Sequence, residues 1–197
     1  MERSPAALIV GGLDGVAPVL AQRLMGQGWD VALSGDDEEE GDELLSAFPG
    51  LENAEFIPAH PDDEGDVSAL MEEAEALFDR LDLLLFAFFP PFPDPLGKTP
   101  GQLFDLVAGD HLQAPYLAAR YGKRLLEEGG KLAFLHPPFP EEEPLGAMAR
   151  GGLESWVAAL EKSWAPAIPV ARFENRAVDR ESALALLEAV MDFAAKE

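Results

Sequence analysis

The stretch of sequence that decides the fold is residues 9–17, which read Ile9-Val10-Gly11-Gly12-Leu13-Asp14-Gly15-Val16-Ala17. A short apolar run comes directly before it, and apolar residues at helical spacing follow it. A strand, a glycine-rich turn and a helix start in this order bring a dinucleotide pyrophosphate onto the N-terminus of a helix. The stretch therefore predicts an α/β fold with a candidate phosphate-binding turn.

Apolar runs and helical patterns alternate along the rest of the chain. The runs expected to form strands are residues 6–10, 29–34, 55–58, 81–89, 131–136 and 168–173. Helices are expected at residues 16–25, 36–48, 67–78, 99–128 with an interruption near Gly109, 145–164 and 180–195. This alternation predicts one Rossmann-like domain over residues 1–197, with a doubly wound parallel sheet in the order 3-2-1-4-5-6 and helices on both faces.

The charge balance limits the partners that the chain can have. It contains 14 Lys+Arg against 37 Asp+Glu, a net charge of −23, so its surface repels nucleic-acid phosphates and anionic lipids. The absence of cysteine excludes disulfides and thiolate metal sites. No apolar stretch reaches the roughly 18 residues of a membrane span, and the first residues lack the parts of a signal peptide. We expect a cytoplasmic protein without a nucleic-acid or membrane partner.

Two parts of the chain resemble a known family. The helical pattern that begins at Val67 runs without a gap into Phe78-Asp79-Arg80-Leu81-Asp82-Leu83-Leu84-Leu85. The glycine loop fits the pattern T-G-x-x-x-G-x-G at Gly11 and Gly15, with Val10 in place of threonine and Ala17 in place of the last glycine. With these features, residues 6–175 resemble a short-chain dehydrogenase/reductase.

The resemblance also shows which family residues are missing. The family's N-N-A-G after the fourth strand is replaced by Phe86-Ala87-Phe88-Phe89. The asparagine of the family's catalytic tetrad falls at His111, and the serine falls at Pro137, or at His136 with a shift of one residue. The tyrosine and lysine of Y-x-x-x-K fall at Gly146 and Arg150, or nearby if the loop has a different length. The resemblance therefore implies a member of the family without its Ser-Tyr-Lys residues.

These replacements have a direct chemical consequence. Hydride transfer in the family uses a tyrosine whose pKa is lowered by a lysine, so that the hydroxyl can exchange a proton with the substrate oxygen. Glycine and proline do not titrate, and Arg150 releases no proton near neutrality. The first hypothesis is therefore a catalytically degenerate protein with a binding or structural role. The alternative is an NAD-dependent short-chain oxidoreductase for a small carbonyl or alcohol substrate, with a rearranged acid–base site.

The residues that could hold a dinucleotide are Gly11, Gly12, Gly15, Val16 and Asp36. The glycines allow close approach to phosphate, but they also suit a tight strand-to-helix turn, and the carboxylate of Asp14 repels pyrophosphate. Asp36 or Asp37 would accept a hydrogen bond from a ribose hydroxyl and reject a 2′-phosphate, which favours NAD over NADP. The expectation is therefore either no cofactor or NAD.

His111 and His136 are the candidate acid–base pair, because both are expected near the strand ends where the crevice opens and histidine titrates near neutrality. No third residue has the spacing of a metal ligand, so no metal site is expected.

Phenylalanines gather at the same edge of the expected sheet: Phe86, Phe88, Phe89 and Phe92, with Phe134 and Phe139 on the next strand and loop. They could be packed core in the volume of a nicotinamide, a crevice wall for a small apolar ligand, or an association surface. The resemblance implies a homodimer or homotetramer through the helices at residues 99–127 and 145–164. Gly151 and Gly152 would allow those helices to approach one another closely.

Overall fold

The computed structural model describes residues 3–11, 13, 15–47, 49–51, 53–126, 129–140, 142–176 and 180–195. Its strands are β1 (Ala6–Val10), β2 (Asp30–Gly35), β3 (Glu55–Pro58), β4 (Leu83–Phe86), β5 (Lys131–His136) and β6 (Val170–Glu174). Its helices are α1 (Ala17–Gly26), α2 (Glu38–Ala47), α3 (Glu64–Phe78), α4 (Pro100–Ala108), α5 (Ala114–Leu126), α6 (Pro144–Trp164) and α7 (Arg180–Ala195). A single π-helical turn, η1 (Gly109–Gln113), joins α4 to α5.

The strands form one parallel sheet in the order β3-β2-β1-β4-β5-β6, which confirms the expected topology. Val10 of β1 lies between Ser34 of β2 and Phe86 of β4, and His136 of β5 pairs with Glu174 of β6. The carboxyl ends of all these strands therefore meet at one edge, where open α/β sheets bind their ligands.

The core has two layers because alternate residues of each buried strand face opposite sides of the sheet. Leu8 and Val10 pack with α3, α5 and α6 on one face, whereas Ala7 and Ile9 pack with α1 and α7 on the other. All four side chains are fully buried. Burial on both faces explains why the strands read as continuous apolar runs rather than as alternating patterns.

β4 is shorter than the expected strand at residues 81–89. The N–H of Ala87 still donates to the carbonyl of Val10 at 2.8 Å, but the backbone of Phe88 then crosses closely over Gly11. Pro90 and Pro91 follow, and neither has an N–H with which to extend the sheet. The expected strand thus ends where the chain enters a proline-rich loop.

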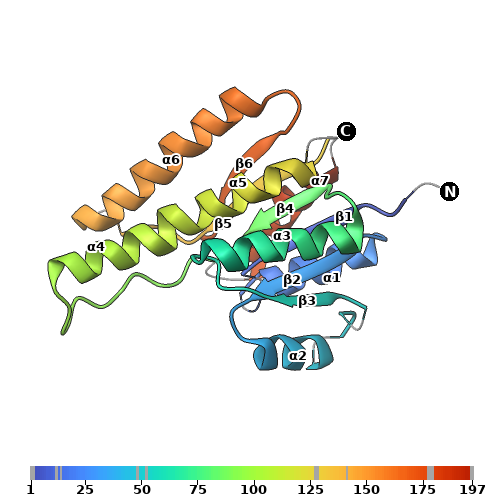
Figure 1. The fold of residues 1–197 in the computed structure, drawn as a ribbon, viewed down its shortest axis with the longest axis horizontal. Helices are drawn as coiled ribbons and strands as arrows, with labels where there is room; N and C mark the ends of the chain where they lie inside the picture. Colours follow the sequence, from blue (N-terminus) through green and yellow to red (C-terminus); the bar gives the residue numbers. More distant parts are fainter. Residues whose placement is uncertain are drawn as a thin grey trace.

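The interruption expected near Gly109 is confirmed as η1. Pro115 lies four residues after His111 and cannot donate to its carbonyl, and its ring crowds that carbonyl, so a regular helix is disfavoured there. The chain accommodates this with the wider turn of η1, whose member His111 is fully buried. In Figure 1, α4, η1 and α5 form one long helical rod that extends past the sheet.

Within the described part of the chain, no helix combines the length and the apolar composition needed to cross a bilayer.

Candidate functional site

Two hollows lie at the carboxyl edge of the sheet, one on each side of the glycine loop. The first, called here the β2 hollow, has a volume of about 240 Å³ and is lined by Gly11, Leu13, Gly35, Asp36, Glu40, Ala87, Phe88, Phe89, Pro90 and Pro91. The second, the β5 hollow, has a volume of about 190 Å³ and is lined by Gly15, Val16, Ala17, Ala87, Phe89, Leu135, Pro137 and Asn175. Ala87 and Phe89 are walls of both hollows.

The structure distinguishes the two aspartates that follow β2. Asp37 accepts a hydrogen bond from the N–H of Glu40 at 2.9 Å and so stabilises the start of α2. Asp36 is exposed and lines the β2 hollow. Of the two, Asp36 is therefore the carboxylate available to a ligand.

The glycine loop contributes one glycine to each hollow. Gly11 has a φ of +79°, and a Cβ there would lie 2.4 Å from the Cβ of Phe88, so packing within the chain already requires glycine at this position. Gly15 has a φ of +62° and faces open space next to Val16, the N-cap of α1. Gly12 and Asp14 lie outside the described residues.

Beside the hollows, five aromatic side chains form what we call the ring cluster: Phe89, Phe92, Phe139, His111 and His136. Phe92 stacks on His111 with ring centroids 4.8 Å apart, and Phe139 stacks on His136 at 5.0 Å. Phe89 contacts both imidazoles, at 6.0 and 5.8 Å. The rings come from the loop after β4, from η1 and from the end of β5 with its following loop.

His111 is completely buried in the ring cluster, and neither of its ring nitrogens has a hydrogen-bond partner. Burial lowers the pKa of His111 to about 4, and the nearby His136 contributes in the same direction. The imidazole is therefore neutral at pH 7 and is closed off from solvent.

His136 is buried as well, but both of its nitrogens are bonded. Nδ1 lies 2.8 Å from the carbonyl oxygen of Pro137, and Nε2 lies 3.1 Å from a guanidinium nitrogen of Arg172. A carbonyl can only accept and a guanidinium can only donate, so the ring is neutral with its proton on Nδ1. Burial lowers the pKa of His136, and the hydrogen bond to Pro137 opposes this in part. Arg172 is itself paired with Glu154 of α6 at 3.0 Å.

Comparisons with known proteins find likeness in sequence mainly in the N-terminal part of the chain. The model of the short chain dehydrogenase family matches residues 5–87. Drosophila melanogaster 3-hydroxyacyl-CoA dehydrogenase type-2 is 32% identical over 83 residues, which are 42% of this chain and 32% of that protein. An uncharacterized oxidoreductase of Mycobacterium tuberculosis is 27% identical over 124 residues, 63% of this chain and 46% of that protein. The matched segments thus span less than half of either relative.

Solved structures extend the likeness in fold to nearly the whole chain. A metagenomic short-chain oxidoreductase in complex with NADP covers 99% of this chain, and 92% of its own length is covered, with a TM-score of 0.82 and 19% identity. The Pseudomonas aeruginosa RhlG/NADP active-site complex covers 98% of this chain and 90% of its own, with a TM-score of 0.84 and 16% identity. Residues 5–87 thus match the short chain dehydrogenase family model, and nearly the whole chain shares the fold of these short-chain oxidoreductase structures.

Gly146 and Arg150, where the resemblance places the family's tyrosine and lysine, make other contacts in this structure. Gly146, in the first turn of α6, lies against the loop after β5, and a Cβ there would lie 2.0 Å from the carbonyl oxygen of Pro140. Arg150 donates to Glu154 at 3.1 Å, one helical turn further along α6. Neither position offers a group that exchanges protons.

The chain has two tyrosines, and both lie on α5 away from the two hollows. Tyr116 packs against Trp156 with ring centroids 6.2 Å apart. Tyr121 donates its hydroxyl to Glu64, and this hydrogen bond is the main cause that raises the pKa of Tyr121. A short-chain dehydrogenase/reductase needs the opposite shift in its catalytic tyrosine.

The residues of the β2 hollow suit one part of a nicotinamide dinucleotide, whereas the residues toward the β5 hollow suit the rest of it less well. At the β2 hollow, Asp36 could accept from ribose hydroxyls, as the sequence indicates. The side chain of Phe89 lies between the two hollows and separates them. No lysine or arginine is among the described residues that line either hollow, so no side chain there offers a positive charge to phosphate. The N–H of Gly11 is already bonded to the carbonyl of Ser34 at 2.7 Å, and Pro18 in the first turn of α1 has none. Among the described residues, Gly11 therefore offers no free N–H to a pyrophosphate, and Phe89 separates the two hollows that a dinucleotide would have to span.

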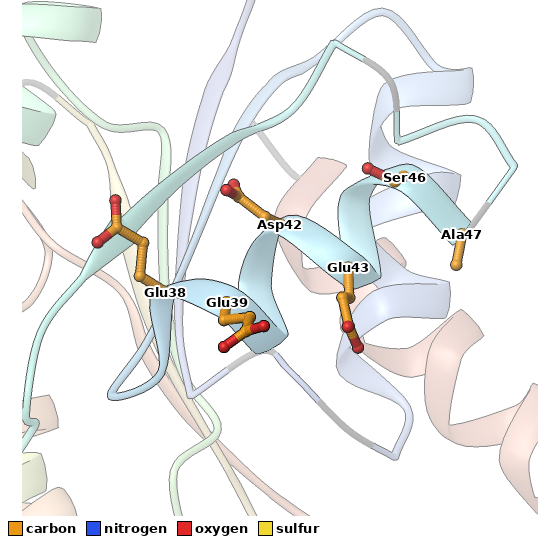
Figure 2. Close-up of a pocket in the computed structure, with 6 residues that line it drawn as sticks. All are labelled: Glu38, Glu39, Asp42, Glu43, Ser46 and Ala47. Carbon is orange, nitrogen blue, oxygen red and sulfur yellow. The ribbon is translucent and has the colours of Figure 1, made fainter.

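A third hollow, with a volume of about 780 Å³, is an acidic groove along α2. It is lined by Glu38, Glu39, Asp42, Glu43, Ser46 and Ala47. Figure 2 shows that these side chains all come from one helix and spread apart rather than converge on one point. No group of three or more histidines, aspartates or glutamates among the described residues could hold a metal ion.

Arg172, which contacts His136, and Glu154, which pairs with Arg172, were not expected at this site. The pairing of β5 with β6 places Arg172 beside Phe134, two residues before His136. A strand register was needed to see this neighbourhood, and no local motif indicates it.

Proposed function

We propose that the chain is a catalytically silent short-chain dehydrogenase/reductase with a binding or structural role in an oligomer, and with weak or no dinucleotide binding. The observation that supports this most directly is the ring cluster. Phe89, Phe139 and the two imidazoles contact one another where a substrate would have to meet a nicotinamide. An apolar small ligand would have to displace the same rings.

The chemistry of the neighbouring groups supports the same proposal. Reduction of a carbonyl needs a proton donor within hydrogen-bond reach of the developing alkoxide. Gly146 and Pro137 have no such proton, and neither tyrosine lines the hollows. On this proposal, the chain has the fold of these oxidoreductases but does not catalyse hydride transfer.

The proposed partner is a second copy of the chain, bound through residues 99–127 and 145–164. Phe104 and Tyr116, which are 48% and 49% exposed, lie on the long rod, and Gly151 of α6 faces open space. An isologous dimer would bury this same face of the rod on both chains.

The test is oxidation of NADH and NADPH by the purified protein in the presence of a panel of small aldehydes and ketones. The proposal predicts no turnover above the rate without protein. Turnover that persists through purification and scales with protein concentration would contradict it.

A second candidate is an NAD-dependent oxidoreductase that uses His111 or His136. The observation that favours it is that the fold brings these histidines, far apart in sequence, into contact with the same two rings, Phe89 and Phe139. If turnover is found, His111→Ala and His136→Ala separate the candidates. Loss of turnover in either variant would support the second candidate, and unchanged turnover in both would exclude it.

A further inference from the structure

A hollow outside the crevice lies between α3 and α5, two helices that lie side by side on one face of the sheet (Figure 1). Its volume is about 330 Å³, which falls within the range of small-molecule sites. We call it the α3–α5 hollow, and its lining residues are Ser68, Glu72, Arg120, Tyr121, Lys123 and Arg124. None of them lines the β2 hollow or the β5 hollow.

Two of these side chains join the helices to each other. Tyr121 donates its hydroxyl to Glu64 in the first turn of α3, and Arg124 pairs with Glu75 near the other end of that helix at 2.8 Å. The α3 residues of the lining fall between these two positions in the sequence. The two contacts therefore hold α3 and α5 together on either side of the hollow.

Arg120 and Glu72 line the hollow from opposite helices, and both are exposed. Among the described residues, neither side chain has a hydrogen bond or an ion pair, whereas the ammonium of Lys123 lies 5.6 Å from the centroid of the Trp164 ring. A guanidinium only donates hydrogen bonds, and a carboxylate only accepts them. The hollow therefore presents one unpaired group of each sign to a molecule that reaches both.

The charges around the hollow favour a ligand that carries both signs of charge. Arg120, Lys123 and Arg124 are three of the 14 basic residues of the chain, and together they repel a simple cation. A simple anion meets the net charge of −23 of the whole chain and, at short range, the carboxylate of Glu72. A zwitterion has no net charge and can pair with Arg120 and Glu72 at once.

We propose that the α3–α5 hollow binds a zwitterionic ligand with a carboxylate and an ammonium group, either a free α-amino acid or a short peptide with free ends. The carboxylate of the ligand accepts hydrogen bonds from the guanidinium of Arg120, whose planar shape suits bidentate pairing. The ammonium of the ligand donates to Glu72. The hydroxyl of Ser68 can donate to the carboxylate or accept from the ammonium.

The inference goes beyond the proposed function and does not depend on it. The α3–α5 hollow shares no lining residue with the crevice at the carboxyl edge of the sheet. Phe104, Tyr116 and Gly151, which mark the proposed contact between copies of the chain, are also not among its lining residues.

The experiment titrates the full isotope-labelled chain with L-leucine, glycyl-L-leucine, isoamylamine and isocaproate, and follows the NMR shifts of the backbone amides. Isoamylamine is L-leucine without its carboxylate, and isocaproate is L-leucine without its ammonium. We expect the tighter of the two zwitterions to bind with a Kd of about 1 mM, and both single-charge analogues to bind at least about tenfold more weakly. Tighter binding of L-leucine indicates an amino-acid site, and tighter binding of the dipeptide indicates a peptide site.

Variants of the two unpaired residues locate the effect. Arg120→Gln and Glu72→Gln should each weaken the binding of the tighter zwitterion about tenfold. The exchange of the two charges, Arg120→Glu with Glu72→Arg, keeps one group of each sign in the hollow and should bind more tightly than either single variant. The controls are Glu73→Gln and Lys162→Gln, exposed positions outside the lining, which should leave the Kd unchanged.

Binding of isocaproate as tight as that of both zwitterions would overturn the inference, because the hollow would then be a simple anion site. The absence of a saturable shift with either zwitterion at about 20 mM would overturn it as well. Unchanged binding in both Arg120→Gln and Glu72→Gln would place the ligand elsewhere and would also overturn it. None of these results bears on the proposed function, which is tested by turnover.

Discussion

The carbonyl oxygen of Pro140 lies directly against Gly146, so closely that a Cβ at position 146 would be 2.0 Å from it. This contact fixes the loop after β5 to the first turn of α6. The same loop carries Phe139, whose ring packs on His136 and Phe92. Gly146, where the sequence comparison expects the family's tyrosine, therefore also positions the loop that carries a ring of the ring cluster.

The first prediction concerns the contact between Gly146 and the carbonyl of Pro140. Gly146→Ala should lower the free energy of unfolding by about 1 to 3 kcal/mol, because the added methyl group forces the loop backbone to move. Gly151→Ala is the matched control in the same helix, where nothing lies within 4 Å, and it should raise the free energy of unfolding by about 0.5 to 1 kcal/mol. Urea denaturation measures both, and a change of the same sign in the two variants would contradict the contact.

The second prediction concerns pH. His111 has a pKa of about 4 in the folded protein against 6.5 ordinarily, so between these values the unfolded chain binds more protons than the folded one. The contribution of His111 to the free energy of unfolding should therefore rise by about 3 kcal/mol as the pH goes from about 4 to 6.5. His136, whose pKa is also lowered, adds in the same direction.

The variant that isolates this effect is His111→Phe, which keeps an aromatic ring in the cluster and removes the titrating group. Urea denaturation at a series of pH values should give a shallower rise for the variant than for the parent protein. Parallel curves would show that His111 does not titrate differently in the two states.

The third prediction concerns association. Gly151→Trp should reduce the mass measured by light scattering to that of a single chain, 21.2 kDa, because a large side chain would occupy the open face of α6. Glu188→Trp, an exposed position on α7 across the sheet, is the control and should leave the mass unchanged. An unaltered mass in Gly151→Trp would contradict an interface at this face.

Gly151 and Gly152 also show what sequence alone could not resolve. Both were expected to serve contact between helices of two chains. The structure gives Gly152 a different neighbour, since a Cβ there would lie 2.8 Å from Leu112 in η1 of the same chain. Which of two adjacent glycines faces outward depends on the rotation of α6 on the sheet, and the helical pattern alone leaves that rotation uncertain by about one residue.

The order of the strands was predictable, because buried parallel strands such as Leu83–Phe86 are wholly apolar and alternate with amphipathic helices. The end of β4 was not predictable, because Ala87, Phe88 and Phe89 have the composition of a strand and leave the sheet only to cross Gly11. Packing at a distance in sequence overrides local preference there.

The sequence predicted which residues lie together at the candidate site better than it predicted their hydrogen bonds and protonation. His111, His136 and Phe89 were expected near one another and lie in one cluster. That His136 is bonded on both nitrogens follows from Arg172, which reaches it only through the pairing of β5 with β6. The roles of the histidines and of Gly11, Gly15, Val16 and Asp36 toward a ligand stay predictions.

The most direct measurement is a crystal structure of the protein after soaking in NAD⁺. The account predicts that Phe89, Phe92, Phe139, His111 and His136 keep their mutual contacts and that no ordered nicotinamide lies beside Pro137. An ordered nicotinamide in the β5 hollow, with Phe89 turned away from the two imidazoles, would contradict it.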